Sequence, residues 1–452
     1  MKFLNKQFTQ ETLKLALPVM LTQVGQVSVN LFDNIIVGKL LGAKALAAVS
    51  LGNAMFFSIF IFGLGFSLAI PPLVSEAHSQ HDHNRINSIF RHGFVVNIIL
   101  AFVLMLLIFG IIPLMPYLNQ PKEILPDTIT FLSIVTLSII PFMIFQTMRE
   151  VSEGLSFTIG VTKATIFANI INVILNYVFI EHFKMGVAGS AWATFIARVA
   201  MMVFLYYVLI KEEKTRRYIK DFSLKIKDFT KEMFEKLIRL GFPTALQLFF
   251  EVTAFAGAAF ICGLISAKDI AAHQIALSMA SFTFNLCVGF SVASTVMIGR
   301  KLGEKDFVNL EKVGFNNLKI AFLFMLMCGI FFILGRNILP TFFTKKEDIE
   351  VIKLASKLMI IAALFQLSDG IQVTALGCLR GIQDVKIPSI LTFIAYWVIT
   401  IPLGYYLCFV LKMGAFGMWI ALGIGLTISA VLLVLRFRNL SEKKIKKQFI
   451  KL

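Results

Sequence analysis

The chain has 452 residues, of which 58% are hydrophobic and only 15% are charged. A soluble protein of this length could not hide so much apolar surface from water, so the composition excludes an ordinary soluble enzyme and predicts a polytopic membrane protein. The net charge of +17 could indicate a nucleic-acid partner. The basic residues border apolar segments instead of alternating with aromatic residues on one face, so we expect no nucleic acid.

At about 20 apolar residues per span, the sequence divides into about twelve membrane-spanning helices. The predicted spans are 15–38, 46–73, 91–113, 126–148, 164–182, 186–210, 238–265, 271–299, 315–335, 352–377, 388–410 and 414–436. Most of the 43 lysine and arginine residues fall on one side of the membrane if both termini are cytoplasmic. The positive-inside rule therefore predicts cytoplasmic termini.

The second half of the sequence repeats the first. Five segments of the first half return in order in the second half: LPVMLTQ (17–23) as FPTALQL (242–248), GLGFS (63–67) as CVGFS (287–291), HD (81–82) as KD (305–306), EGLSFTIGVTK (153–163) as LGCLRGIQDVK (376–386), and KMGVAGSAW (184–192) as KMGAFGMW (412–419). Each half holds six predicted spans, and an even number brings both halves into the membrane from the same side. The pattern predicts a parallel repeat about an axis along the membrane normal, as in secondary transporters.

The repeat divides the chain into two lobes and two basic segments. We expect an N-terminal lobe at 1–210, a cytoplasmic linker at 211–236, a C-terminal lobe at 237–437 and a cytoplasmic tail at 438–452. The fold class is thus an all-α membrane protein with twelve transmembrane helices in two six-helix lobes.

Three isolated acids stand within apolar stretches, namely Asp33, Glu251 and Asp369. A carboxylate at membrane depth costs at least a few kcal/mol, so such residues usually face a cavity and handle protons, cations or cationic ligands. A structural role satisfied by neighbouring groups is the alternative for any one of them. For all three together, the functional interpretation is favoured.

The flanking charges give each acid a depth. Glu251 follows Arg239 by 12 residues and Asp369 follows Lys357 by 12, so both lie about 18 Å into a core about 30 Å thick. Asp33 precedes Lys39 by six residues, about 9 Å from the outer boundary. Glu251 and Asp369 can therefore share a cation or a proton in the C-terminal lobe, while Asp33 belongs to the other lobe.

Polar side chains accompany Asp33. Asn172 and Asn176 lie four residues apart on one helical face, and Thr194 lies at a comparable depth in the next span. Carboxylate, amide and hydroxyl oxygens suit a hard cation and also suit a protonated Asp. Polar residues of this kind often only join helices, at roughly 1 kcal/mol each. We favour a functional role for the two Asn residues; for Thr194 and Asn169 the two interpretations are equally supported.

The sequence resembles the multidrug and toxin extrusion (MATE) transporters over essentially the whole chain. The features that carry the resemblance are the repeat, the Pro that opens each half, the paired KMG motifs and LRGIQD after the tenth span. The three acids resemble the pattern of the NorM-type branch, with an Asp in span one, a Glu in span seven and an Asp in span ten. The resemblance implies export of cationic and amphipathic drugs in exchange for Na⁺ or H⁺, by rocking of one lobe against the other. It also implies cation or proton coupling by Asp33, Asn172, Asn176, Thr194, Glu251 and Asp369.

One departure from the family pattern leaves the second-lobe site and the coupling ion open. Where sodium-using relatives carry a Tyr one turn before the span-ten acid, this chain has Phe365, which offers no oxygen ligand but can present a cation–π face. We expect Phe365 and the three acids to line the substrate cavity. Arg198 could be the counter-ion of a buried acid, but we favour its extension to the cytoplasmic interface.

The remaining candidates carry less weight. His78, His81 and His83 have metal-like spacing but are expected in a solvated loop. The five Cys residues lie in apolar spans without CxxC spacing and are interpreted as small core residues. No Walker A motif, nucleophile elbow or HExxH is present, which disfavours an ATP-driven pump and a membrane hydrolase.

We therefore expect a monomeric, cation-coupled multidrug antiporter in a bacterial plasma membrane, with no enzymatic activity, no cofactor and no metal other than Na⁺. A lipid-linked oligosaccharide flippase of the same superfamily is the alternative. Its pyrophosphate cargo would need several cavity-facing Arg or Lys residues, whereas the midplane charges here are acids. A channel would need a continuous polar stripe, and the spans carry only isolated polar residues.

Overall fold

A computed structural model describes residues 4–117, 121, 123–225, 228–344 and 348–450. Within these residues every regular element is helical, which confirms the all-α class. Eleven helices in the described part are long and apolar enough to cross a membrane, and a bent pair completes a twelfth span. Six spans fall in each half of the sequence, as predicted. Residues 226–227 of the predicted linker and 451–452 of the predicted tail lie outside the described residues.

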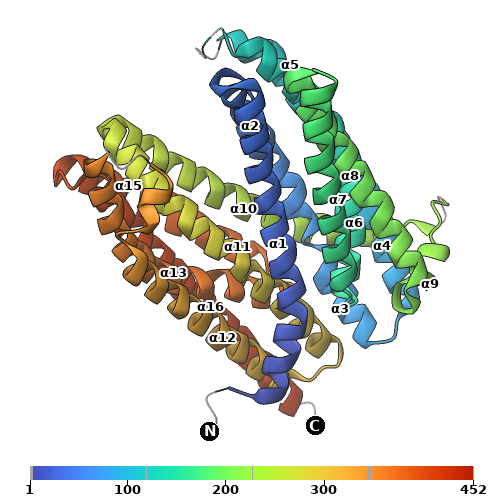
Figure 1. Ribbon diagram of the computed structural model, residues 1–452. Helices are drawn as coiled ribbons and strands as arrows, with labels where there is room; N and C mark the ends of the chain where they lie inside the picture. The colour runs from blue at the N-terminus through green and yellow to red at the C-terminus, as the bar shows by residue number, and fades with distance from the viewer. Residues whose placement is uncertain (1–3, 118–120, 122, 226–227, 345–347, 451–452) are drawn as a thin grey trace. The chain divides into compact units, whose positions relative to one another are not determined.

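The first half begins with a helix of 36 residues and ends with a short helix after the sixth span (Figure 1). Its helices are α1 (Lys6–Leu41), α2 (Ala43–Ser67), α3 (Ile70–Ser79), α4 (His83–Ile111), η1 (Ile112–Tyr117), α5 (Leu125–Leu137), α6 (Ile139–Gly154), α7 (Ile159–Tyr177), η2 (Val178–His182), α8 (Gly186–Lys211) and α9 (Glu213–Lys220).

The second half follows the same order. Its helices are α10 (Lys231–Ile265), α11 (Ala267–Gly303), α12 (Phe307–Gly335), η4 (Leu339–Phe342), α13 (Ile349–Gly381), α14 (Lys386–Phe393), η5 (Ile394–Thr400), α15 (Ile401–Tyr405), η6 (Tyr406–Val410) and α16 (Gly414–Ile450).

The fourth span is broken, which its continuous apolar pattern did not predict. Helices α5 and α6 meet at Ser138 with a bend of 42°. Pro141 stands at the third position of α6. It lacks an N–H group and its ring would collide with the carbonyl of residue 137 in a continuous helix, which favours a break just before it.

The chain packs into two compact units whose boundaries fall inside continuous helices. The N-terminal unit is Leu21–Ala245, and the C-terminal unit combines Met1–Met20 with Leu246–Leu452. The boundaries lie two residues after Pro18 in α1 and two after Pro243 in α10, the prolines that open the two repeats. The start of each opening helix thus packs with the other half of the sequence, whereas the lobe boundaries predicted at 210 and 237 follow the linker.

Each unit has its own apolar core. The N-terminal core gathers around Phe60, Phe131 and Met143. The C-terminal unit holds one cluster around Phe290 and Phe437 and another around Trp419.

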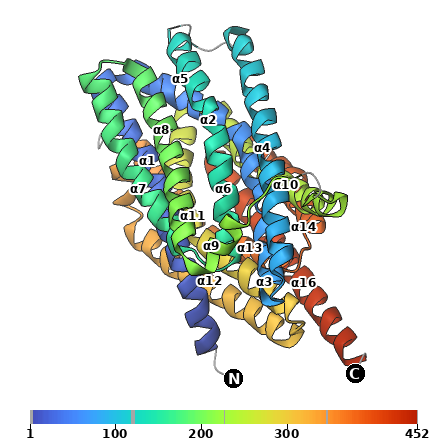
Figure 2. The same cartoon turned by 90° about the vertical axis from the view of Figure 1, so that its right-hand side faces the viewer.

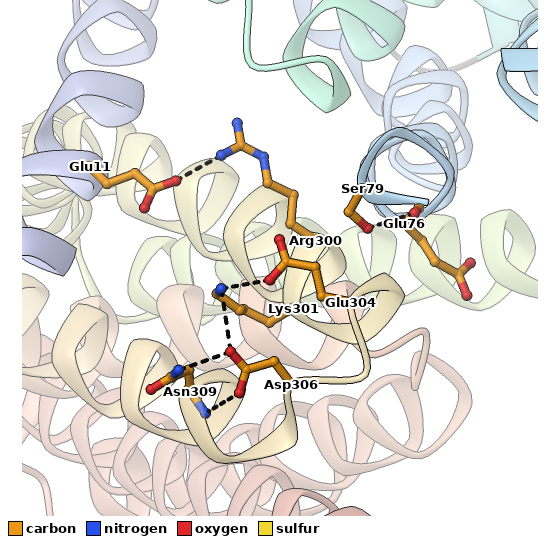
Figure 3. A network of polar contacts seen from close by, with 8 residues as sticks. All are labelled: Glu11, Glu76, Ser79, Arg300, Lys301, Glu304, Asp306 and Asn309. Carbon is orange, nitrogen blue, oxygen red and sulfur yellow. Dashed lines mark hydrogen bonds and ion pairs between the residues drawn. The ribbon is translucent and has the colours of Figure 1, made fainter. Parts of the chain in front are cut away.

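An ion pair ties the first turns of α1 into the C-terminal unit, since Arg300 of α11 binds Glu11 of α1 at 2.7 Å (Figure 3). At the end of α11, Lys301 binds Glu304 at 2.6 Å. The chain enters α1 and leaves α16 at the same end of this unit (Figure 2), as an even number of spans requires.

Candidate functional site

The structure joins Asp33 to one of the two predicted Asn residues. Nδ2 of Asn176, on α7, donates to Oδ1 of Asp33, on α1, at 2.5 Å. Asn176 is fully buried and Asp33 half-buried. The carboxylate therefore has one fixed donor, from a helix distant in sequence.

Two amide oxygens beside this contact have no hydrogen-bond partner among the described residues. They are Oδ1 of Asn176 and Oδ1 of Asn172, which is 2% exposed and one helical turn away. A buried acceptor without a donor costs about 1–3 kcal/mol, so such an oxygen is normally met by water or an ion. We call Asp33, Asn172 and Asn176 the Asp33 cluster.

The other two polar candidates of this region point elsewhere. The hydroxyl of Thr194 donates to the carbonyl of Ser190, in its own helix, at 3.1 Å. Asn169 lies against α1, where a Cβ on Gly25 would stand 2.8 Å from its Nδ2.

In the C-terminal unit, Glu251 is held by two residues that the sequence analysis did not single out. Nε2 of Gln372, on α13, donates to Oε1 of Glu251, on α10, at 3.1 Å. The hydroxyl of Tyr396 donates to Oε1 of Gln372 at 3.3 Å. All three side chains are at least nine-tenths buried. We call Glu251, Gln372 and Tyr396 the Glu251 network.

Asp369 lies three residues before Gln372 on the same face of α13 and is 4% exposed. The carboxylates of Asp369 and Glu251 are near enough to interact electrostatically. Phe365, one turn earlier, packs its ring against Phe255 and Trp419 with centroids 6.2 Å and 5.6 Å apart. Phe365 therefore belongs to an aromatic core beside the acid.

A π-helical segment presents Tyr396. Residues Ile394–Thr400 form η5, and Pro402 follows two residues after its end. Proline has no N–H group to donate to the carbonyl one turn back, so the series of helical backbone hydrogen bonds is interrupted there. A π turn accommodates this interruption, and such turns frequently occur at functional sites. The sequence did not indicate a role for Tyr396, because a single Tyr in an apolar run usually belongs to the core. For Gln372, its spacing of three from Asp369 was the available signal.

The side chain of Arg198 does not extend to the cytoplasmic interface as expected. Its guanidinium donates to Oγ of Ser138 at 2.6 Å and lies over the rings of Phe56 and Phe142, 4.8 Å and 5.2 Å from their centroids. Ser138 is the joint of the broken span, so Arg198 ends inside the helix bundle and the preferred extension to the cytoplasmic interface is wrong. The C-terminal end of α5 carries partial negative charge, which favours a cation there.

The candidate metal-binding His residues and the Cys residues show no sign of a functional site. His83 pairs its Nδ1 with the hydroxyl of Tyr218 at 2.8 Å, and His81 adopts a left-handed conformation before α4. The described residues contain no group of three His, Cys, Asp or Glu side chains that could hold a metal ion. All five cysteines are free and four are buried, as expected of core residues.

Comparison with known proteins identifies this arrangement. The MatE family model matches residues 18–178 and again residues 243–406. Probable multidrug resistance protein NorM of Agrobacterium fabrum is 34% identical over 442 residues, covering 96% of this chain and 94% of its own. Multidrug resistance protein NorM of Photobacterium profundum is 32% identical over 439 residues, 95% of each chain. Multidrug resistance protein MdtK of Yersinia pseudotuberculosis is 31% identical over 440 residues, also 95% of each.

Solved structures share the fold at lower identity. An outward-facing multidrug resistance MATE transporter of the MOP superfamily superimposes with a TM-score of 0.88 at 21% identity, covering 96% of each chain. A MOP superfamily transporter of Pyrococcus furiosus, whose binding pocket of reverse polarity is said to suggest a different function, gives 0.89 at 20% identity, covering 97% of this chain and 96% of its own. One fold therefore accommodates different pockets, and function must be argued from the residues.

Proposed function

Because the chain belongs to the MatE family of transporters, we propose that it is an antiporter that exports cationic or amphipathic organic compounds in exchange for Na⁺, H⁺ or both. The relatives named NorM and MdtK are multidrug resistance proteins and align over nearly their whole length. A multidrug efflux transporter is a membrane transporter and not an enzyme.

The Asp33 cluster is the observation that carries cation coupling. It combines a half-buried carboxylate with two buried amide oxygens that lack donors. Oxygens of these types are the ligands of hard cations, and they also accept from a protonated carboxylate or from water. The cluster therefore gains from binding Na⁺ or H⁺.

The Glu251 network supports a second site in the other unit. Gln372 satisfies one oxygen of Glu251, while Asp369 places another acid nearby. Two carboxylates in a dry environment repel each other unless a cation or a proton joins them. A cationic substrate meets the same requirement, so coupling ion and substrate compete for the acids. This competition is the basis of exchange: the ion that enters displaces the drug.

The acids also weigh against the flippase alternative. A pyrophosphate cargo needs cationic partners, and among the residues of the two sites the charged ones are carboxylates. Three arginines inside the helix bundles are already engaged within the protein. Arg198 donates to Ser138 and lies over two rings, Arg149 binds Glu153 at 2.7 Å, and Arg380 donates to the hydroxyl of Ser291 at 3.0 Å.

The sequence also supports a location and an assembly state for the protein. We place the protein in a bacterial inner membrane, as a monomer, with its basic linker and tail in the cytoplasm. The positive-inside rule supports this orientation.

Transport by the purified protein in proteoliposomes tests the proposal. Export of a fluorescent cationic drug should follow an imposed Na⁺ gradient, an imposed H⁺ gradient, or both, applied one at a time with the membrane potential clamped. Drug movement that neither gradient alters would overturn antiport.

A further inference from the structure

A fixed basic helix follows the sixth span. Helix α9 buries Thr215 and Tyr218 against the rest of the N-terminal unit. The side chains it exposes are mostly basic: Lys214, Arg216, Arg217 and Lys220. Residues 211–225 hold six Lys and Arg residues against three acids. The cations of α9 itself therefore lie on the exposed side of a packed helix.

Hydrogen bonds hold α9 in place. The hydroxyl of Tyr218 lies 2.8 Å from Nδ1 of His83 on α4, and the hydroxyl of Thr215 donates to the carbonyl of Leu209 on α8 at 2.7 Å. Arg91 of α4 donates to the carbonyl of Asp221, just after α9, at 2.7 Å. Burial raises the pKa of Tyr218, against the opposing effect of Arg217, so the phenol stays neutral in this contact.

The end of α8 marks the level of the membrane surface. Tyr206 and Tyr207 are 50% and 53% exposed in its last turns, and Nζ of Lys211 lies 4.3 Å from the ring centroid of Tyr207. Exposed Tyr residues gather at the headgroup level of membrane proteins, where Lys side chains also end. Helix α9 begins two residues after Lys211, so its cations start at that level.

We propose that the exposed face of α9, together with Lys211, binds the headgroups of anionic phospholipids. The cations are spread along a helix face and do not converge on one point. This suits a layer of phosphates better than a single soluble anion. Each Lys or Arg near an anionic membrane surface contributes about 1 kcal/mol to binding at that surface. Three or four such residues are therefore enough to favour anionic over zwitterionic lipids. This surface is independent of the acids proposed for transport.

Lipid retention by the full-length protein tests the proposal. The variant Lys214→Gln/Arg217→Gln/Lys220→Gln removes three cations and spares Arg216, whose Nε donates to the carbonyl of Ile210. A control, Lys443→Gln/Lys446→Gln/Lys447→Gln, removes three exposed cations from the end of α16. Native mass spectrometry after equilibration with equal phosphatidylglycerol and phosphatidylcholine measures the preference. We expect the α9 variant to lose phosphatidylglycerol preference about tenfold or more, and the control to retain it.

Three outcomes would overturn the proposal: unchanged preference in the α9 variant, an equal loss in the control, or full displacement of the lipid by millimolar glycerol phosphate. If the α9 variant does not fold, wild-type protein and Lys214→Arg/Lys220→Arg replace it. Both should hold phosphatidylglycerol and release it as salt rises. Retention that is indifferent to salt would also contradict a headgroup site.

Discussion

Two of the three isolated acids accept from an amide on another helix: Asn176 for Asp33 and Gln372 for Glu251. An amide is a neutral donor, so it orients a carboxylate without neutralising it. The acid remains able to take up a cation or a proton, which an Arg or Lys partner would oppose. At the scale of single residues, this choice of partner suits exchange better than a permanent ion pair.

We expect Glu251→Gln and Asp369→Asn each to reduce drug efflux about tenfold or more, because each removes a negative charge from the shared site. Resistance of cells and efflux from proteoliposomes measure the effect, at membrane expression matched to wild type. Glu213→Gln, an exposed acid of α9, is the control. Wild-type efflux in both site variants would make them structural residues.

In the other unit, Asp33→Asn should impair coupled transport, and Asn172→Ala or Asn176→Ala should reproduce part of the loss by removing oxygens of the cluster. Thr194→Ala should have little effect, because its hydroxyl bonds within its own helix. The measurement is the dependence of efflux on the imposed ion gradient. Full coupling in both Asn172→Ala and Asn176→Ala would show that the Asp33 cluster is not a cation-coupling site.

The sequence predicted the acids and missed part of their surroundings for a physical reason. An ionised group at membrane depth is expensive enough to be conspicuous. A Tyr or Gln there costs little once bonded, so Tyr396 could not be told from a core residue, and only its spacing from Asp369 distinguished Gln372. The direction of Arg198 depended on the break at Ser138, which arises from Pro141 and packing and not from apolar pattern.

At the scale of elements, the repeat is visible in the backbone. His81 and Lys305 are both left-handed and precede Asp82 and Asp306, which cap α4 and α12. The KMG motifs behave likewise, with Gly186 and Gly414 at φ of 58° and 61°. These motifs are turns whose geometry the repeat preserves.

One predicted alignment within the repeat is wrong by one helical turn. The offset of 223 between residues 153–163 and 376–386 conflicts with the turns themselves. Left-handed Ser156 corresponds to left-handed Gln383, and Phe157 bonds to Ser152 as Asp384 bonds to Leu379. The true offset there is 227. A shift of four residues keeps every side chain on its helix face, so an apolar pattern cannot detect it.

The GFS motifs mark close helix contacts. A Cβ on Gly65 would lie 2.5 Å from the Cα of Ala245 on α10, and one on Gly289 would lie 2.7 Å from the carbonyl oxygen of Ala16 on α1. We expect Gly65→Ala and Gly289→Ala each to lower stability by about 1–3 kcal/mol, because the obstacle is backbone. Thermal melting in detergent measures this. Gly110→Ala, which meets nothing within 4 Å, is the control and should not destabilise; equal melting of all three variants would contradict the packing argument.

Asp306 should support the start of α12 in a pH-dependent way. Burial tends to raise its pKa, but the hydrogen bonds from Asn309 and the charge of Lys301 outweigh this and lower it (Figure 3). A lowered pKa stabilises the helix start above the ordinary value of 3.8, and the effect is lost as pH falls through the folded-state value. Asp306→Ala should cost about 1 kcal/mol, read as faster amide exchange in the first turn of α12 at neutral pH. Exchange unchanged from wild type would refute the cap.

At the scale of the whole molecule, two acidic sites in separate compact units raise the question of how many cations move per drug. The sequence predicted the two halves and the twelve spans, because apolar length and repetition are properties of the chain alone. It did not predict that the units exchange the first parts of α1 and α10, since that depends on which helices pack together.

The net charge moved in each transport cycle decides whether the membrane potential affects export. If one monovalent cation enters as one monovalent drug leaves, no net charge crosses, and the membrane potential of about 2.3 kcal/mol per charge per 100 mV does not affect export. With the Asp33 cluster in one unit and the Glu251 network with Asp369 in the other, two cations can enter per drug, and export becomes electrogenic. We expect the second case, with at least part of the current carried by protons, because Phe365 supplies no oxygen to a sodium ion. Drug efflux at fixed ion gradients, with the potential set by valinomycin and potassium, measures this: export should accelerate as the compartment that the coupling cations enter becomes more negative. A rate indifferent to potential would refute two-cation exchange, and full export on a sodium gradient at uniform pH would refute the proton component.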